Sequence, residues 1–76
     1  MTAFDRWIKS CESTGTEIYR LEGSGETGLY MTKKQYWHEN SRYWTEPVYH
    51  VWARGKWRLT TLNCQKAYET WRKCRK

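Results

Sequence analysis

The segment VYHVWARGKWRLT, residues 48–60, decides the fold of this chain. Two runs rich in β-branched and aromatic residues, 48–53 and 56–60, flank the pair Arg54 and Gly55. Such runs around a two-residue turn predict an antiparallel hairpin. The left-handed position of the turn is assigned to Gly55, because glycine has no Cβ to clash there. The protein is therefore expected to contain an antiparallel sheet.

Further extended segments precede this hairpin. Residues 16–22 predict a short strand, and residues 29–38 alternate in a way that places aromatic side chains on both faces of a second strand. The three glycines between these segments predict a turn. A polar loop is expected at residues 39–42, followed by a short extended piece that ends before Pro47, since proline cannot occupy a central strand.

The two ends of the chain predict amphipathic helices. After Thr2, apolar residues recur at helical spacing, with Thr2 as N-cap, Asp5 as the carboxylate of a capping box and Gly15 as the stop. Asn63 is the expected N-cap of a second helix with its own apolar stripe. The residues assigned to the core are Trp7, Ile8, Leu59, Ala67 and Trp71.

The predicted fold is a single α+β domain over residues 1–76. It consists of an N-terminal helix, an antiparallel meander of three to four strands and a C-terminal helix. Both helices are expected on one face of the sheet, which leaves the other face to solvent or to a partner. We expect that open face to carry the function.

The composition indicates what the core is made of. Leu, Ile, Val and Phe together number nine of 76 residues, and the net charge is +6, which approaches the composition of a disordered chain. Six Trp and six Tyr replace the missing aliphatic area, because each such ring buries on the order of 150–250 Å². The chain is therefore expected to fold around aromatic side chains. Its length excludes multidomain enzymes and repeat arrays.

Targeting and metal-binding patterns are not found in the sequence. No apolar run approaches the length of a signal peptide or a membrane span, so a cytoplasmic location and no membrane partner are expected. The cysteines at 11, 64 and 74 lack the close pairs of a zinc site and the density of a disulfide framework. We expect reduced thiols, no metal and no cofactor.

Candidate catalytic patterns are few. The string GSGETG at 23–28 has GxGxxG spacing, but a dinucleotide-binding loop opens a helix and here a strand follows, so a hairpin loop is the better interpretation. His38 or His50 as general base would suit a small ribonuclease. The alternation of His50 with Val48 and Trp52 is more typical of a histidine on a sheet face. We expect a non-catalytic binding protein, with the ribonuclease as a minor alternative.

The charge is unevenly distributed along the chain. Residues 1–28 hold three basic and five acidic residues, a net −2, whereas residues 29–76 hold eleven and three, a net +8, together with five of the six Trp. Cations alternating with rings favour nucleic-acid binding, because cations neutralise phosphates and rings stack on unpaired bases. The expected contact residues are Lys33, Lys34, Arg42, Arg54, Lys56 and Arg58 for charge, Tyr43 and Trp44 as exposed rings, and Arg72, Lys73 and Lys76 as an extension.

A protein partner fits the same residue types. Trp, Tyr and Arg are enriched at interface hot spots, and a positive patch complements an acidic protein surface as well as it complements phosphate. The second hypothesis is therefore an inhibitor that docks on a host or defence protein, such as a polymerase, a nuclease or CRISPR-type machinery. For the first hypothesis, DNA and RNA are both expected to fit.

Two domain families share features with this chain. Helix, three strands and helix in about 70 residues resembles the double-stranded RNA-binding domain, whose second helix opens with a basic motif; Lys66 in Gln65–Ala67 is the one lysine that carries over. The family's minor-groove histidine is replaced here by the glycine-rich loop 23–28. The basic hairpin and helix within Tyr49–Trp71 are similar to the three-stranded DNA-reading domains of some integrases and plant transcription factors. Both resemblances imply nucleic-acid contact.

The overall character of the chain suggests a third resemblance. A tiny, basic, Trp-rich chain without a catalytic signature resembles the small accessory proteins of bacteriophages. Many of those proteins bind and inhibit host or defence proteins. The resemblance implies a phage or mobile-element accessory protein that acts in the cytoplasm of a bacterial host.

Overall fold

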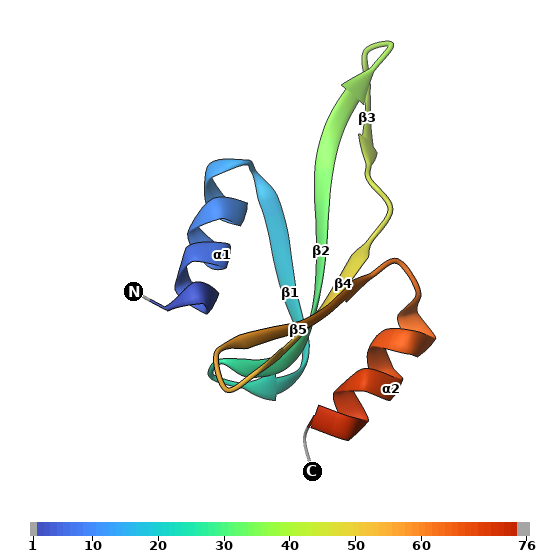
Figure 1. Cartoon of the computed structure of the whole chain (residues 1–76). Coiled ribbons are helices and arrows are strands. Elements are labelled where there is room, and N and C mark those ends of the chain that lie inside the picture. The colour runs from blue at the N-terminus through green and yellow to red at the C-terminus, as the bar shows by residue number, and fades with distance from the viewer. Residues whose placement is uncertain (1, 75–76) are drawn as a thin grey trace.

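The computed structural model describes residues 2–74 (Figure 1). It has the order predicted from the sequence: a helix, antiparallel strands and a second helix. The elements are α1 (Ala3–Ser13), β1 (Thr16–Ser24), β2 (Thr27–His38), β3 (Ser41–Trp44), β4 (Val48–Ala53), β5 (Lys56–Thr61) and α2 (Cys64–Cys74). The α+β class is confirmed. Neither described helix is long and apolar enough to span a membrane.

Both helices begin at the predicted caps. The Thr2 hydroxyl accepts from the amide of Asp5 at 3.1 Å, and the Asp5 carboxylate accepts from the amide of Thr2 at 3.4 Å, which completes the capping box. Gly15 follows α1 in the left-handed region, at φ 73°. The Asn63 side chain accepts from the amide of Lys66 at 3.1 Å. These contacts satisfy amide groups that have no partner within the first turn of a helix.

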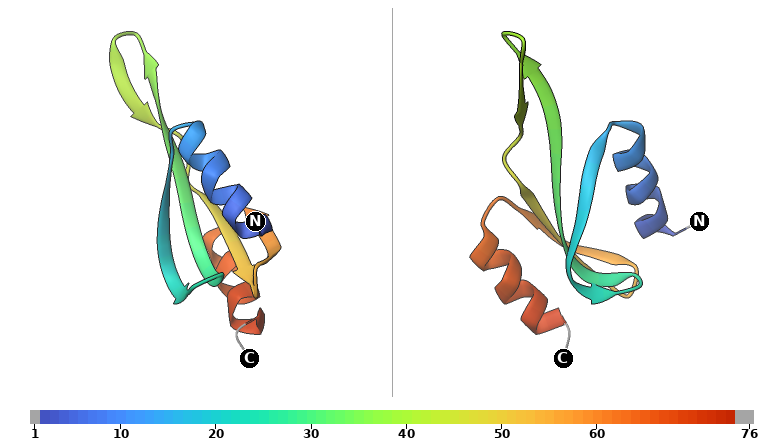
Figure 2. Two further views of the ribbon diagram at one scale, coloured as in Figure 1. Left: turned by 90° about the vertical axis from the view of Figure 1, so that its left-hand side faces the viewer. Right: turned by 180° about the vertical axis from the view of Figure 1, so that it is seen from behind.

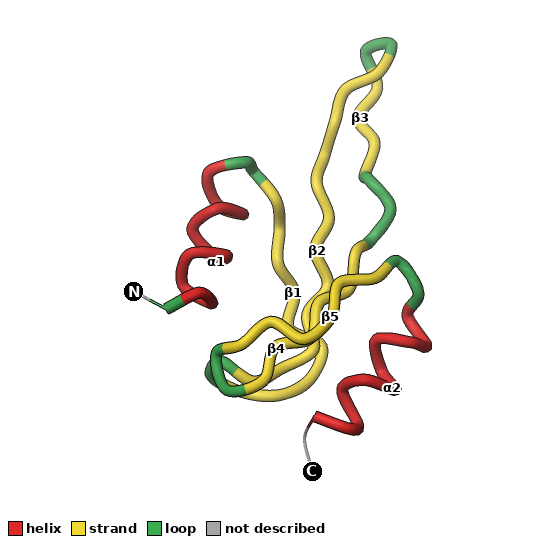
Figure 3. The backbone as a smooth tube through the Cα atoms, in the orientation of Figure 1, coloured by secondary structure: helices red, strands yellow, loops and turns green. Residues whose placement is uncertain are grey.

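Strand β2 is the central strand of the sheet. The strand order is β1-β2-β4-β5, and β3 pairs with the far end of β2 (Figure 3). The first part of β2 lies between β1 and β4, whereas its last four residues pair with β3. β3 and β4 therefore share one position beside β2, separated by residues 45–47, where Pro47 has no amide hydrogen for the ladder. The result is a meander with four strand positions.

The two helices pack on opposite faces of the sheet (Figures 1 and 2). On one face, α2 packs on Leu29 of β2 and Val51 of β4, neither of which has exposed surface. On the other face, α1 packs on the next residues along the strands, Tyr30 and Trp52, which are also buried. Successive residues of a strand point to opposite faces, so β2 and β4 are buried on both. We name these faces the α2 face and the α1 face.

The expectation that both helices lie on one face is therefore wrong. Leu29 alternates with Tyr30, and Val51 alternates with Trp52, so both faces of the sheet carry large apolar groups that need cover. No face stays open as a whole, and the binding surface has to be sought where the helices end. The five residues assigned to the core are buried or half-buried in one or the other cluster: Trp7, Ile8, Leu59, Ala67 and Trp71.

Two turns meet at one end of the sheet. The β4–β5 hairpin is confirmed, although Arg54 is left-handed together with Gly55, at φ 54° and 74°. The string at 23–28 forms the β1–β2 hairpin, as expected. Its Glu26 carbonyl accepts from the amide of Gly55 at 3.0 Å, and its carboxylate accepts from the Thr2 hydroxyl at 2.9 Å. The turn thus joins the β4–β5 hairpin to the start of α1.

The two-sided core predicts which leucine matters for stability. Leu29→Ala leaves a cavity between β2 and α2 and should lower the free energy of unfolding by about 2–5 kcal/mol. Leu62→Ala, at a position that is 63% exposed, should change it by less than about 0.5 kcal/mol. Urea denaturation followed by Trp fluorescence measures both values. Equal losses for the two variants would contradict this description of the core.

Candidate nucleic-acid interface

The β2–β3 hairpin projects beyond both helices (Figures 1 and 2). We name residues 35–44 the arm. Its turn consists of Glu39 and Asn40, both left-handed at φ 50° and 67°, as a tight two-residue hairpin turn requires. The loop expected at 39–42 is therefore wrong in its second half, because Arg42 lies in β3. From Tyr36 to the end of the arm every residue is exposed.

Cross-strand contacts hold the arm together. A two-stranded ribbon without a core beneath it is only marginally stable, so its side-chain pairs matter. The rings of Tyr36 and Tyr43 stack across the strands with centroids 5.8 Å apart. At the base, the Thr45 amide donates to the Lys34 carbonyl at 2.8 Å, and the Thr45 hydroxyl accepts from the Lys34 amide at 2.9 Å. These two bonds continue the ladder past β3.

Rings and cations alternate along one surface of the arm and the adjoining sheet. The Lys33 ammonium lies 4.2 Å from the ring centroid of Trp44 and 5.2 Å from that of Tyr19. The Arg42 guanidinium carbon lies 4.9 Å from the ring centroid of Trp37. We name these five residues the stripe. Both distances to Trp rings lie within the range of a favourable cation–π contact.

Strand register places the stripe on the α2 face. Lys33 and Trp37 are odd-numbered residues of β2, like the buried residues under α2, and the pairing puts the other three members opposite odd-numbered residues of β2. Helix α2 packs on β2, β4 and β5, and the stripe continues beyond it over β1, β2 and β3. Its rings therefore stay accessible: Trp37 is 66% exposed and Trp44 is 41% exposed.

The cations of this surface are not neutralised by direct ion pairs. In the described part of the chain, the one ion pair within 4.0 Å joins His38 to Glu39 at the arm tip. The nearest acid to the stripe is Glu17, which accepts a hydrogen bond from the Tyr19 hydroxyl and so raises the pKa of Tyr19. Glu17 is also the cross-strand partner of Lys33. Among the described residues no carboxylate lies within 4.0 Å of the charged groups of Lys33 or Arg42, so both cations can still bind an external anion beside their rings.

The contact residues expected from the sequence fall into three groups. Lys33, Arg42 and Trp44 belong to the stripe. Lys34 and Tyr43 belong to the same ribbon but point to the α1 face. The exposure expected of Tyr43 and Trp44 is confirmed. Lys76 lies outside the described residues.

The third group gathers at the other end of the sheet. Arg54 and Arg58 line a pocket of about 170 Å³ together with Ala53 and Cys74, between the β4–β5 hairpin and the last turn of α2. We name this region the corner. Three exposed cations belong to the same two elements: Lys56, which pairs with Ala53 across the hairpin, and Arg72 and Lys73 in the last turn of α2. Arm and corner lie far apart in Figure 1, because β2 carries β3 in one direction and the β4–β5 turn lies in the other.

Sequence reasoning missed Trp37 and Tyr19 as surface rings. The usable signal was the recurrence of a Tyr-Trp pair on either side of residues 39–40, at Tyr36–Trp37 and at Tyr43–Trp44. Asn at position 40 tolerates the left-handed region better than most residues, and so favours a two-residue turn at this place. Tyr19 has no such signal, because its neighbours in the stripe come from β2 and β3.

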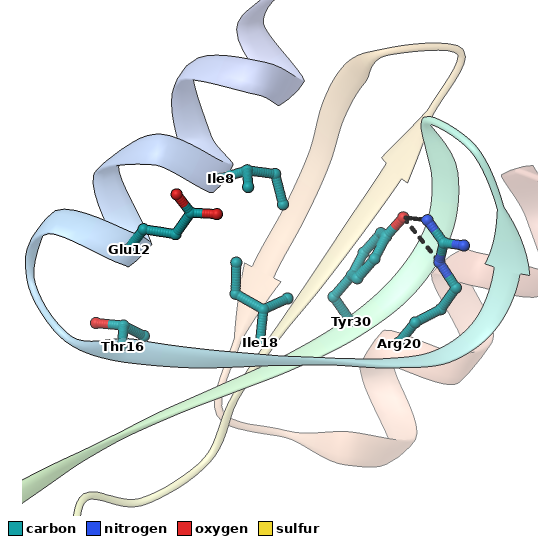
Figure 4. Close-up of a pocket in the computed structure, with 6 residues that line it drawn as sticks. All are labelled: Ile8, Glu12, Thr16, Ile18, Arg20 and Tyr30. Atoms are coloured by element: carbon teal, nitrogen blue, oxygen red, sulfur yellow. Dashed lines mark hydrogen bonds between the residues drawn. The ribbon is translucent and has the colours of Figure 1, made fainter.

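A second pocket lies between α1 and β1 and contains none of the expected contact residues. It has a volume of about 390 Å³ and is lined by Ile8, Glu12, Thr16, Ile18, Arg20 and Tyr30 (Figure 4). The Arg20 guanidinium is already engaged: it donates to the Tyr30 hydroxyl at 2.9 Å and to the Gly25 carbonyl at 2.9 Å. Tyr30 also donates to Gly25. Arg20 thus satisfies a buried hydroxyl and supports the β1–β2 turn.

The histidines lie apart from each other. His50 is on the α1 face beneath Trp7, with Nε2 2.8 Å from the Thr32 hydroxyl and Nδ1 3.1 Å from the Thr60 hydroxyl. This confirms a sheet-face histidine with local hydrogen bonds. His38 is exposed at the arm tip. Among the described residues, no three His, Cys, Asp or Glu side chains are placed to share a metal ion, and the three thiols are free.

No known protein family, curated protein or solved structure matches this chain. The resemblances to RNA- and DNA-binding domains and to phage accessory proteins stay predictions. Function therefore has to be inferred from the arm, the stripe and the corner.

The environment of His50 predicts a pH effect on stability. Burial lowers the pKa of His50 from 6.5 to about 4. Between these values the unfolded chain binds a proton that the folded chain does not, so stability falls as the pH falls from 6.5 towards 4. From pH 7 to pH 5 this single group should cost on the order of 2 kcal/mol.

Urea titrations of the parent and two variants at both pH values measure this effect. His50→Gln should lose most of the difference between pH 7 and pH 5, and His38→Gln, at the exposed histidine, should keep it. The same pH difference in His50→Gln as in the parent would show that other groups are responsible.

Proposed function

We propose that this protein binds single-stranded nucleic acid through the stripe. The observation that carries the proposal is the alternation of three exposed rings with two cations, Lys33 and Arg42, on a surface that neither helix covers. Rings stack on unpaired bases of any sequence, and cations beside them neutralise the phosphates between those bases.

The geometry of the stripe suits stacking. A cation rests on one side of Trp37 and of Trp44, and each of these rings keeps a large exposed area. The planar guanidinium of Arg42 offers a second stacking surface beside the Trp37 ring. Base–aromatic stacking contributes about 1–3 kcal/mol per base, so two or three bases on the stripe would contribute about 2–9 kcal/mol.

The tip of the arm argues against insertion into a duplex groove. A two-stranded ribbon fits the major groove of B-DNA, but its leading residues must then lie between two phosphate backbones. Here the turn carries Glu39, whose side chain is 84% exposed. Phosphates would repel this carboxylate, and the bases of a duplex are already stacked on one another. Unpaired strands avoid both problems.

Docking on an acidic protein surface is the second candidate. It is supported by the Tyr36–Tyr43 stack on the other side of the arm, where both rings are exposed and Lys34 projects from the same face. Exposed tyrosines beside a cation are typical of interface hot spots. A phage-encoded inhibitor of a host or defence protein would use this side of the arm.

Ring substitutions test the proposed function. Trp37→Ala and Trp44→Ala should each weaken binding of a labelled single-stranded oligonucleotide by about tenfold or more, because each removes a stacking platform. Trp57→Ala is the matched control, since Trp57 is 58% exposed but lies on β5, away from the arm. Fluorescence anisotropy at low salt measures the three dissociation constants.

If Trp37→Ala and Trp44→Ala both bind the oligonucleotide as tightly as the parent does, the interface lies elsewhere. An oligonucleotide of mixed sequence that does not bind the parent even at low salt would contradict nucleic-acid binding, and the protein partner would then be the better hypothesis.

A further inference from the structure

The corner is a second basic surface that the stripe does not include. Arg54 and Arg58 line its pocket, and Arg72 and Lys73 stand in the adjoining last turn of α2. The remaining lining residues, Ala53 and Cys74, carry no acidic group. Two arginines at one small pocket have the chemistry to hold a phosphate, which Arg binds with paired N–H donors.

The backbone of the hairpin holds Arg54 in position. Its amide donates to the Thr27 hydroxyl at 2.8 Å, and the next amide, that of Gly55, donates to the Glu26 carbonyl at 3.0 Å. The Glu26 carboxylate accepts from Thr2 at the start of α1, on the α1 face. These hydrogen bonds fix the backbone of the turn. The Arg54 side chain takes no part in them and lines the corner pocket.

Stripe and corner belong to the same side of the sheet. Ala53, which lines the corner pocket, is two residues after Val51 and points with it to the α2 face. Helix α2 runs from a start nearer the arm to an end at the corner (Figure 1), with exposed Lys66 in its first turn. A strand on the stripe can thus continue along α2 to the corner.

We propose that the corner binds a backbone phosphate of the same single strand that stacks on the stripe. The protein then contacts the strand at two separated places, the stripe and the corner. This inference rests on the proposed function of the stripe. Its consequence is that affinity depends on oligonucleotide length, because a short strand reaches one of the two surfaces and a long strand reaches both.

The size of the molecule sets that length. Its longest dimension is 46 Å. At about 3.4 Å per stacked nucleotide, a strand of about 14 nucleotides covers this distance, whereas a strand of about five covers roughly 17 Å. Oligothymidylates of about 20 and about five nucleotides therefore distinguish one surface from two.

The charge-neutralised variant Arg54→Asn/Arg58→Gln tests the corner. Asn is chosen for position 54 because it tolerates the left-handed backbone there. The variant should bind the longer strand about tenfold more weakly, with a salt slope smaller by about 1.4 for two lost contacts of a single strand, and should bind the short strand as the parent does. Arg54→Lys/Arg58→Lys keeps the charge and should keep the slope.

Three results separate the possible failures. If the parent binds both strand lengths with equal affinity, and the neutral variant binds them as the parent does, the proposal for the corner is overturned and the proposal for the stripe stands. Binding of neither length by the parent would overturn the stripe and the corner together. If the hairpin variant has a lowered thermal midpoint, Arg72→Gln/Lys73→Gln on α2 replaces it in the same experiment. If that variant shows the same difference in affinity between the two strand lengths as the parent, the proposal is again overturned.

Discussion

Burial of the adjacent residues Leu29 and Tyr30 on opposite faces of β2 is the constraint on which the rest of the structure depends. Each face needs its own apolar cover, and β4 repeats the requirement with Val51 and Trp52. Two short amphipathic helices at the two ends of the chain meet it, one on each side. Because the sequence has few aliphatic residues, rings fill most of this double core. Phe4, for example, packs edge-on against Trp52 with ring centroids 5.3 Å apart.

The same constraint explains the arm. Strand β2 has 12 residues, and the helices cover only its first part, so its last residues continue where no core lies beneath them. The strand stays ordered there through pairing with β3 and through ring contacts such as that of Tyr36 with Tyr43. Exposure of Trp37 and Trp44 is unfavourable in water, and this cost supports the proposal that the arm binds a ligand.

Local features of the fold could be predicted from the sequence, because they depend on contacts a few residues apart. The caps at Thr2 and Asn63 and the hairpin at 54–55 are of this kind, and all three are confirmed. The side of the sheet on which each helix packs could not be predicted. Apolar residues at helical spacing indicate that one side of a helix is buried. The face of the sheet that buries it depends on how β2 and β4 distribute their rings in three dimensions.

The proposed binding surface also has a part that the sequence predicted and a part that it did not. Residue types and the basic second part of the chain pointed to Lys33, Arg42 and Trp44, whereas their separation from Arg54 and Arg58 follows from topology alone. Two hairpins that point in opposite directions along the sheet convert one basic stretch of sequence into two surfaces. Tyr19 joins the stripe through a strand from the acidic first part, which no charge count along the chain reveals.

The indole N–H groups of the six Trp residues give the most direct test of the stripe, because each reports one place in the structure by NMR. During titration with a single-stranded oligonucleotide, the indole signals of Trp37 and Trp44 should shift, while those of Trp52 and Trp71, buried under the helices, should stay in place. Shifts confined to Trp57, or shifts of the buried pair without the arm pair, would contradict the proposal that the stripe binds the strand.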